Sequence, residues 1–274
     1  MSSLGNIAII GAGSMGGAIL SGLLASTVTA EGGIRVTNRS EAKAAQLRSK
    51  SVSSYALESD PDANTRAVSG ASIVVLGVKP AMVPDVLRQI APALAADAIV
   101  VSIAAGVTTA SIEALVPQVV LRVMPNTPAL IGRGVTGISA GSRATVEHLA
   151  LISALFETVG QVLVIPESKI DALSTISGSG PAYVFYLIEQ LTETAIGMGF
   201  NPQEAATMVN GTFLGSAELL AKSGQGPAEL RRKVTSPAGT TERAIWELEK
   251  GQLSALFDRA TAAALARAKE LAAG

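Results

Sequence analysis

The sequence has 274 residues, of which 48% are hydrophobic and 16% are charged, and its formal net charge is −1. A chain of this length can form about two domains with a sizeable core in each, and its balanced charge argues against a nucleic-acid-binding protein. It contains no cysteine and one histidine, which excludes disulfides and thiolate ligands and leaves little for any metal site. We expect a compact cytoplasmic protein without a metal or a nucleic-acid partner.

The N-terminal stretch places glycines between an apolar strand and an apolar helix. Asn6 to Ile10 predicts the strand, Gly11-Ala12-Gly13-Ser14-Met15-Gly16 follows, and a helical run extends to Ala25. Gly13 and Gly17 also fit the G-x-x-x-G pattern of membrane helices. However, the glycines interrupt any long helix and no basic region precedes them, so we expect no membrane partner. The pattern G-x-G-x-x-G between strand and helix indicates dinucleotide binding.

In this interpretation each glycine has a separate role. Gly11 allows the tight turn, Gly13 lets the backbone approach a pyrophosphate, and Gly16 packs the helix against the strand. A second strand, Gly33 to Asn38, ends in Asn38-Arg39-Ser40. NAD sites usually have an acidic residue there for the ribose 2′-hydroxyl, whereas an arginine suits the 2′-phosphate of NADP. The same residues also fit a plain helix start, with Ser40 as N-cap and Arg39 solvated.

Strands and helices alternate through the rest of the N-terminal half. The apolar strands are typical of a parallel sheet covered on both faces, and such doubly wound sheets bind ligands beyond the carboxyl ends of their strands. Three small or proline-containing loops lie there, although each also fits ordinary loop sequence: Val78-Lys79-Pro80, Ala104-Ala105-Gly106 and Pro125-Asn126-Thr127-Pro128. The predicted elements are strands at 72–78, 98–103, 119–124, 135–140 and 161–165, and helices at 80–94, 108–115 and around His148, which we interpret as a solvated helix-face histidine.

After Pro166 the periodicity is almost entirely helical. We predict main helices at 181–197, 202–222 and 242–273, and therefore a Rossmann domain at 1–165 and a helical domain at 166–274. Several helices are apolar over much of their circumference, which a small domain cannot bury alone. Met198, Met208 and Phe213 are therefore interpreted as core or interface residues of a homodimer.

Seven sequence blocks carry a resemblance to a known family. GAGSMGGAI, TNRS, LGVKP, SIAAGV, RVMPNTPA, SGSGPAY and VTSPAGTT occur in one order along nearly the whole chain. In these blocks the chain resembles pyrroline-5-carboxylate reductase, which makes proline. The resemblance implies an α/β Rossmann domain, a helical dimerisation domain, dimers that frequently assemble to a decamer, and NADPH, or else NADH, as hydride donor.

The resemblance also assigns residues. The implied cofactor-binding residues are Gly11, Gly13, Ser14, Met15, Gly16, Asn38, Arg39, Asn64, Gly77, Val78, Lys79, Pro80, Ala104 and Ala105. The implied substrate-binding residues are Val234, Ser236, Pro237, Ala238, Gly239, Thr240 and Thr241, and Thr241 takes the place of the threonine that reaches the ring nitrogen. Ala238 replaces a usual glycine, and the segments Gln225-Gly226 and Gly251-Gln252-Leu253 also depart from the family pattern.

The Ser236 to Thr241 turn fits this role chemically. A turn that enters a helix presents successive backbone N–H groups, which suit a small carboxylate and need no titrating side chain. On spacing alone, a helix cap at Thr240 or Thr241 is an equal alternative. Hydride transfer to a protonated cyclic imine mainly requires orientation of two rings and an anion site. Thr241 would then stabilise the proton on nitrogen.

Two other functions remain open at this stage. A related imine reductase or a β-hydroxyacid-type dehydrogenase would share the two domains. A resemblance to the β-hydroxyacid type would imply a catalytic lysine early in the helical domain. Here no lysine lies between Gly180 and Lys222. A non-catalytic NADP-binding sensor would bind the cofactor but would not need the carboxylate turn.

Overall fold

The computed structural model describes residues 4–26, 28 and 30–273, and side chains to residue 270. The chain forms two compact units: one runs to Ser179 and includes the C-terminal residues from Leu265, and the other is Gly180–Ala264. The predicted domain boundary at 165/166 lies before a short helical segment that packs in the first unit.

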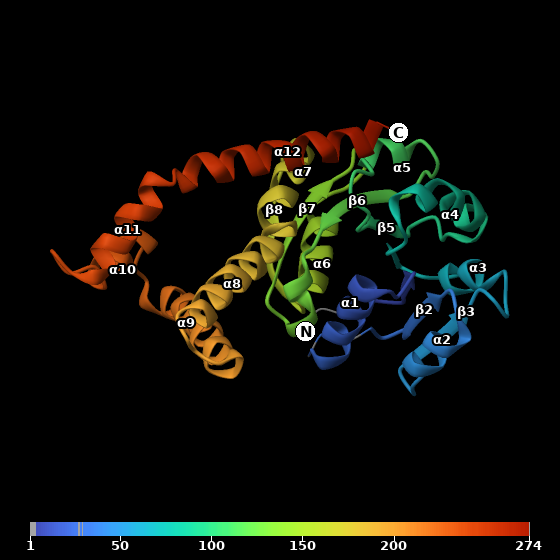
Figure 1. Ribbon diagram of the computed structural model, residues 1–274. Helices are drawn as coiled ribbons and strands as arrows, with labels where there is room; N and C mark the ends of the chain where they lie inside the picture. The colour runs from blue at the N-terminus through green and yellow to red at the C-terminus, as the bar shows by residue number, and fades with distance from the viewer. Residues whose placement is uncertain (1–3, 27, 29, 274) are drawn as a thin grey trace. The chain divides into compact units, whose positions relative to one another are not determined.

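The first unit is built on an eight-stranded sheet in the order β3-β2-β1-β4-β5-β6-β7-β8 (Figure 1). Strands β1 to β6 are parallel to one another, β7 is antiparallel to β6, and β8 is parallel to β7. The doubly wound fold is confirmed, and two reversed strands extend it. The strands are β1 (Ile7–Ile10), β2 (Ile34–Asn38), β3 (Val52–Ala56), β4 (Ile73–Leu76), β5 (Ile99–Ser102), β6 (Val119–Met124), β7 (Gly134–Ala140) and β8 (Gly160–Val164).

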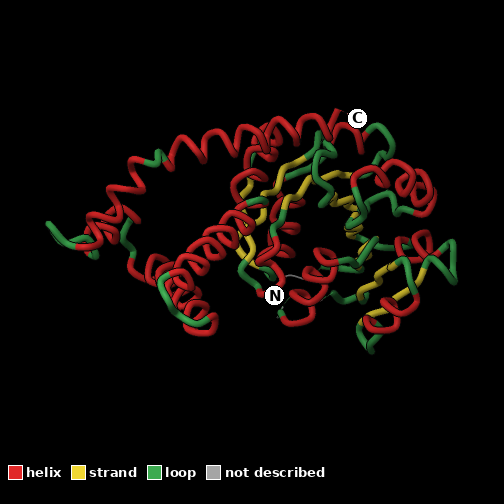
Figure 2. The backbone as a smooth tube through the Cα atoms, viewed as in Figure 1, coloured by secondary structure: helices red, strands yellow, loops and turns green. Residues whose placement is uncertain are grey.

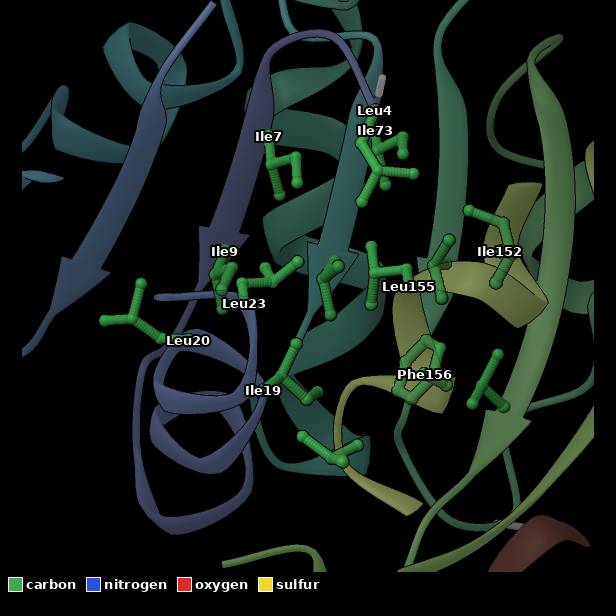
Figure 3. Close-up of a cluster of buried hydrophobic side chains, with 14 of the residues drawn as sticks. Leu4, Ile7, Ile9, Ile19, Leu20, Leu23, Ile73, Ile152, Leu155 and Phe156 are labelled. Atoms are coloured by element: carbon green, nitrogen blue, oxygen red, sulfur yellow. The ribbon is translucent and has the colours of Figure 1, made fainter. Parts of the chain in front are cut away.

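Two hydrophobic layers cover the two faces of the sheet because successive strand residues point to opposite sides. In β1, Ile7 and Ile9 join the layer formed by α1 and α6, whereas Ala8 and Ile10 join the layer formed by α3, α4 and α5. Figure 3 shows Ile19, Leu20 and Leu23 of α1 and Phe156 of α6 over the first face. The helices are α1 (Ser14–Ala25), α2 (Glu41–Leu47), α3 (Ala63–Val68), α4 (Val83–Ile90), α5 (Thr109–Glu113) and α6 (Val146–Glu157).

Short 3-10 helices divide some of the predicted elements. The helix expected at 80–94 is α4 with η1 (Pro80–Met82) before it and η2 (Ala91–Ala93) after it, and η3 (Thr127–Ile131) follows β6. β3 and α3 were not predicted from the sequence. β3 reads VSSYA and alternates buried with exposed or half-buried positions at the edge of the sheet, so it lacks the apolar run of the other strands.

A buried arginine ties the segment after β8 to the sheet. This segment contains η4 (Glu167–Lys169), α7 (Ile170–Leu173) and a π-helix, η5 (Ser174–Gly178). Arg122 of β6 is 3% exposed, and it pairs with Asp171 at 2.5 Å and Glu167 at 3.5 Å. Glu167 also accepts hydrogen bonds from the backbone N–H and hydroxyl of Thr109 at 2.7 and 2.6 Å. A buried charge is stable only with such partners.

The second unit contains helices and loops alone (Figure 2). Its helices are α8 (Gly180–Gly197), α9 (Pro202–Ser223), α10 (Pro227–Lys233) and α11 (Thr240–Lys250), and α12 (Leu253–Ala273) begins in it. The single helix predicted at 242–273 is wrong, because the chain breaks between α11 and α12, where Gln252 has φ +51°. Helix α10 was not predicted.

Many large apolar side chains of this unit are exposed. Phe185 is 66% exposed and Met198 is 77% exposed, and Val184, Tyr186, Leu187, Leu191, Met208 and Leu214 are further examples. Exposed apolar surface on this scale is typical of a protein interface.

None of the helices in the described part of the chain has the length and hydropathy of a membrane-spanning segment.

Candidate active site

Two hydrogen bonds to β2 fix the loop between β1 and α1. The backbone N–H of Gly11 donates to the Thr37 hydroxyl at 3.2 Å, and that of Ala12 donates to the Thr37 carbonyl at 2.9 Å. Helix α1 begins at Ser14, and its N-cap, Gly13, makes no side-chain cap hydrogen bond. The first N–H groups of a helix have no partner within the helix, so this end can bind an anionic group.

The glycines of the loop differ in their surroundings as their predicted roles require. Gly11 has φ +86°. A Cβ on Gly16 would lie 2.7 Å from the Gly11 carbonyl oxygen, and a Cβ on Gly77 would lie at the same distance from that oxygen. A Cβ on Gly13 would meet nothing within 4 Å. Gly16 and Gly77 are therefore needed for packing, whereas Gly13 leaves open space at the start of α1.

Gly77 also places the loop after β4 beside the loop after β1. Its N–H donates to the Ile10 carbonyl at 2.8 Å. Strands β2 and β4 lie on opposite sides of β1, so this is the switch point at which doubly wound sheets bind ligands. Val78 is half-buried, and Lys79 and Pro80 are exposed beyond it.

The end of β2 presents one buried amide and one exposed cation. Asn38 is 4% exposed, and its Nδ2 is buried without a hydrogen-bond partner. Arg39 is exposed and has no ion pair within the described part of the chain. Ser40 is the N-cap residue of α2, as predicted for an ordinary helix start, but its side chain makes no cap hydrogen bond. Instead, the Glu58 carboxylate accepts from the Glu41 backbone N–H at 2.5 Å.

Asn64 has a similar unsatisfied atom. It lies in α3, is 3% exposed, and donates from Nδ2 to the Gln89 side chain at 3.0 Å, while its Oδ1 is buried without a partner. Unpaired buried polar atoms are rare. Asn38 and Asn64 thus leave one donor and one acceptor that fit a polar ligand such as the adenosine end of a dinucleotide.

The loops after β5 and β6 complete this side of the sheet. Ala104 is 5% exposed, Ala105 is exposed, and Gly106 has φ +76°. After β6, Asn126 donates to the Ser177 carbonyl at 2.9 Å and accepts from the Val135 N–H at 2.8 Å. Asn126 therefore fixes its loop to β7 and to the π-helix, a role that its loop sequence alone did not indicate.

The Ser236–Thr241 segment lies in the second unit, after α10, and its last two residues are the first two of α11. Helix α11 begins at Thr240 with Gly239 as N-cap and without a side-chain cap. The alternative of a cap at Thr240 or Thr241 is therefore wrong, because both residues already lie in the first helical turn. Val234, Ser236, Pro237, Ala238, Thr240 and Thr241 are exposed.

Ala238 and Glu242 shape this turn. Ala238 has φ +58°, a conformation that favours glycine. Its N–H donates a hydrogen bond to the Glu242 carboxylate at 2.9 Å, so this N–H already has a negatively charged acceptor. A pocket of about 440 Å³ lies beside the turn and has both arginines and glutamates in its lining. It is lined by Arg231, Arg232, Thr235, Glu242, Arg243, Ile245, Trp246 and Glu249.

The single histidine has a local structural role. His148 Nδ1 lies 3.0 Å from the Thr145 N–H, and its own N–H donates to the Thr145 hydroxyl, which forms a capping box at the start of α6. The described residues contain no group of three or more histidine, cysteine or acidic residues that could hold a metal.

Comparison with known proteins identifies the family. Residues 167–271 match the family described as pyrroline-5-carboxylate reductase dimerisation, and residues 6–106 match the family described as NADP oxidoreductase coenzyme F420-dependent. The chain is 40% identical to a pyrroline-5-carboxylate reductase of Corynebacterium melassecola over 97% of this chain and 98% of that one. It is 39% identical to the Pseudomonas aeruginosa enzyme over 97% and 96% of the two chains.

Solved structures agree with this result. A pyrroline-5-carboxylate reductase of Coxiella burnetii superimposes with a TM-score of 0.88 at 37% identity, covering 97% of this chain and 98% of that chain. The Plasmodium falciparum pyrroline carboxylate reductase with NADP bound gives a TM-score of 0.84 at 26% identity, again over 97% and 98%. Sequence identity of 37–40% over nearly the full length shows that the chain belongs to the pyrroline-5-carboxylate reductase family.

Proposed function

We propose that this protein reduces 1-pyrroline-5-carboxylate to L-proline with NAD(P)H, the last step of proline biosynthesis. The observation that carries the proposal is full-length identity of about 40% to enzymes of that name. The open space at Gly13 and the start of α11 after Ala238 support our assignment of two anion sites, one for the pyrophosphate and one for the substrate carboxylate.

We propose that the loop residues Gly11, Gly13, Ser14, Met15 and Gly16 bind the pyrophosphate through backbone N–H groups. At the adenosine end we assign Asn38, Arg39 and Asn64, and along the rest of the cofactor Gly77, Val78, Lys79, Pro80, Ala104 and Ala105. The unpaired Nδ2 of Asn38 and Oδ1 of Asn64 support this assignment. The bound nicotinamide supplies the hydride.

We propose that Val234, Ser236, Pro237, Ala238, Gly239 and Thr240 bind the substrate carboxylate. The N–H of Ala238 bonds to Glu242 in this structure, and the substrate carboxylate would replace the Glu242 oxygen there. We assign Thr241 to the ring nitrogen. Thr241 is an exposed residue at the second position of α11, and its hydroxyl oxygen can accept a hydrogen bond from the protonated imine nitrogen, which keeps the proton on nitrogen and so favours the electrophilic form.

The assembly extends beyond one chain. The exposed apolar surface of α8 and α9 supports the homodimer that the family description names. We further propose that dimers assemble to a decamer, that the protein is cytoplasmic, and that the functional boundary lies at residues 165/166. The match to the dimerisation family begins at residue 167, which supports that boundary.

The proposed activity is tested by following NADPH absorbance with the purified protein and 1-pyrroline-5-carboxylate. NADH and a cyclic imine without the carboxylate serve as parallel substrates. We expect rapid oxidation that requires the carboxylate. Turnover of both imines at equal rates would indicate a general imine reductase, and tight cofactor binding without turnover would indicate a sensor; either result would reject the proposal.

A further inference from the structure

The end of β2 lacks the acidic residue of an NAD site, but the fold brings a carboxylate to it from another strand. Glu58 follows β3, and three contacts hold it against residues 38–41. The Leu57 N–H donates to the Asn38 carbonyl at 2.9 Å, and the Glu58 N–H donates to the Arg39 carbonyl at 3.1 Å. The third contact is from the Glu41 N–H to the Glu58 carboxylate, at 2.5 Å. Glu58 therefore has a defined position beside Arg39.

Two other acidic residues of this region, Glu41 and Asp60, form ion pairs. Glu41 pairs with Arg48, and the hydrogen bond from Arg48 lowers the pKa of the Glu41 carboxyl. Asp60 pairs with Arg66 at 3.0 Å. Glu58 forms no ion pair within the part of the chain that the structure describes, and the same is true of Arg39. A carboxylate and a guanidinium, neither of which forms an ion pair among the described residues, thus lie at the end of β2.

These two charges act on a dinucleotide in opposite ways. A guanidinium attracts the 2′-phosphate of NADP(H), whereas a carboxylate accepts a hydrogen bond from the 2′-hydroxyl of NAD(H) and repels that phosphate. We propose that Glu58 is a specificity-determining residue that opposes Arg39, limits the preference for NADPH, and allows the protein to bind both cofactors. This inference rests on the proposed function, which places the adenosine ribose at residues 38–40.

The experiment replaces Glu58→Gln and measures the affinities of NADP+ and NAD+ by calorimetry, without the imine substrate. The amide oxygen of glutamine can still accept from the Glu41 N–H, so the variant removes charge and keeps the hydrogen bond. We expect tighter NADP+ binding and weaker NAD+ binding, with a change of about tenfold in the ratio of the two dissociation constants. High salt should reduce the NADP+ gain, because the repulsion is exposed to solvent. The kcat/KM ratio for NADPH and NADH should change in the same direction.

Two controls separate the possible results. Glu157→Gln removes an exposed carboxylate at the end of α6 and should change neither affinity. Glu58→Ala, which also removes the hydrogen bond, provides a second variant if the glutamine variant does not fold. Equal weakening of both cofactors together with a lower melting temperature would mean that Glu58 only supports α2, and would overturn the inference.

Arg39→Ala distinguishes failure of this inference from failure of the proposed cofactor site. If Arg39→Ala weakens NADP+ alone and Glu58→Gln changes neither affinity, the role of Glu58 is wrong and the site at β2 stands. If neither variant changes the ratio of the two affinities, the ribose does not lie at the end of β2, and both proposals fail.

Discussion

Gly13 offers the sharpest test of the cofactor loop, because its substitution should affect the ligand and not the fold. A Cβ at Gly13 would meet no protein atom within 4 Å, and its φ of −74° is accessible to alanine. In Gly13→Ala the methyl group would occupy the space in which the pyrophosphate approaches the start of α1. Displacement of the pyrophosphate should remove at least one charge-assisted hydrogen bond, a loss of about 2 kcal/mol or roughly 30-fold in the cofactor dissociation constant.

The assay is a titration of NADPH binding together with a thermal melt. Gly17→Ala is the matched control, because a Cβ there also meets nothing within 4 Å but lies inside α1. It should stabilise the helix by about 0.5–1 kcal/mol and leave NADPH affinity unchanged. Unchanged affinity in a folded Gly13→Ala protein would refute the placement of the pyrophosphate.

Three further substitutions test other parts of the structure. Thr241→Ala should lower kcat with 1-pyrroline-5-carboxylate by about 100-fold while Thr241→Ser retains most activity, and equal pH–rate profiles for Thr241→Ala and the parent would reject its role at the nitrogen. Ala238→Gly should raise stability by about 1 kcal/mol in denaturant titrations, because it relieves the positive φ of Ala238; a decrease would contradict that account. Arg122→Ala should lower stability by about 3–5 kcal/mol, since Asp171 and Glu167 lose their buried partner, and a loss below about 1 kcal/mol would show that water or another cation replaces it.

Much of the N-terminal fold could be predicted from local patterns. Short apolar strands separated by helical runs indicate a parallel sheet, and Gly11, Gly13 and Gly16 mark the loop because each glycine answers a backbone constraint that is local in sequence. β6 was placed at its observed bounds for the same reason. β3 was missed, since an edge strand buries only alternate residues and has no apolar run to detect.

The C-terminal turn was found by its resemblance to a family rather than by its spacing. Its sequence could not distinguish a cap at Thr240 or Thr241 from a helix that begins at Thr240, because both readings use the same small residues. The positive φ values of Ala238 and Gln252 likewise depend on how neighbouring helices must turn, which helical periodicity alone does not specify.

The sequence by itself determined the alternation of strands and helices in most of the N-terminal half, the glycine loop, the absence of cysteine chemistry and the family. Only the tertiary structure decided which charges meet. The Glu58 carboxylate, which follows β3, accepts a hydrogen bond from the Glu41 backbone N–H. Arg122 pairs with two acids of a later segment, and the Asn126 side chain donates to the Ser177 carbonyl. Such pairs lie far apart along the chain, so no local pattern encodes them. They form because folding brings separate strands, loops and helices together, and for Arg122 and Asn126 because burial makes an unpaired charge or amide unfavourable.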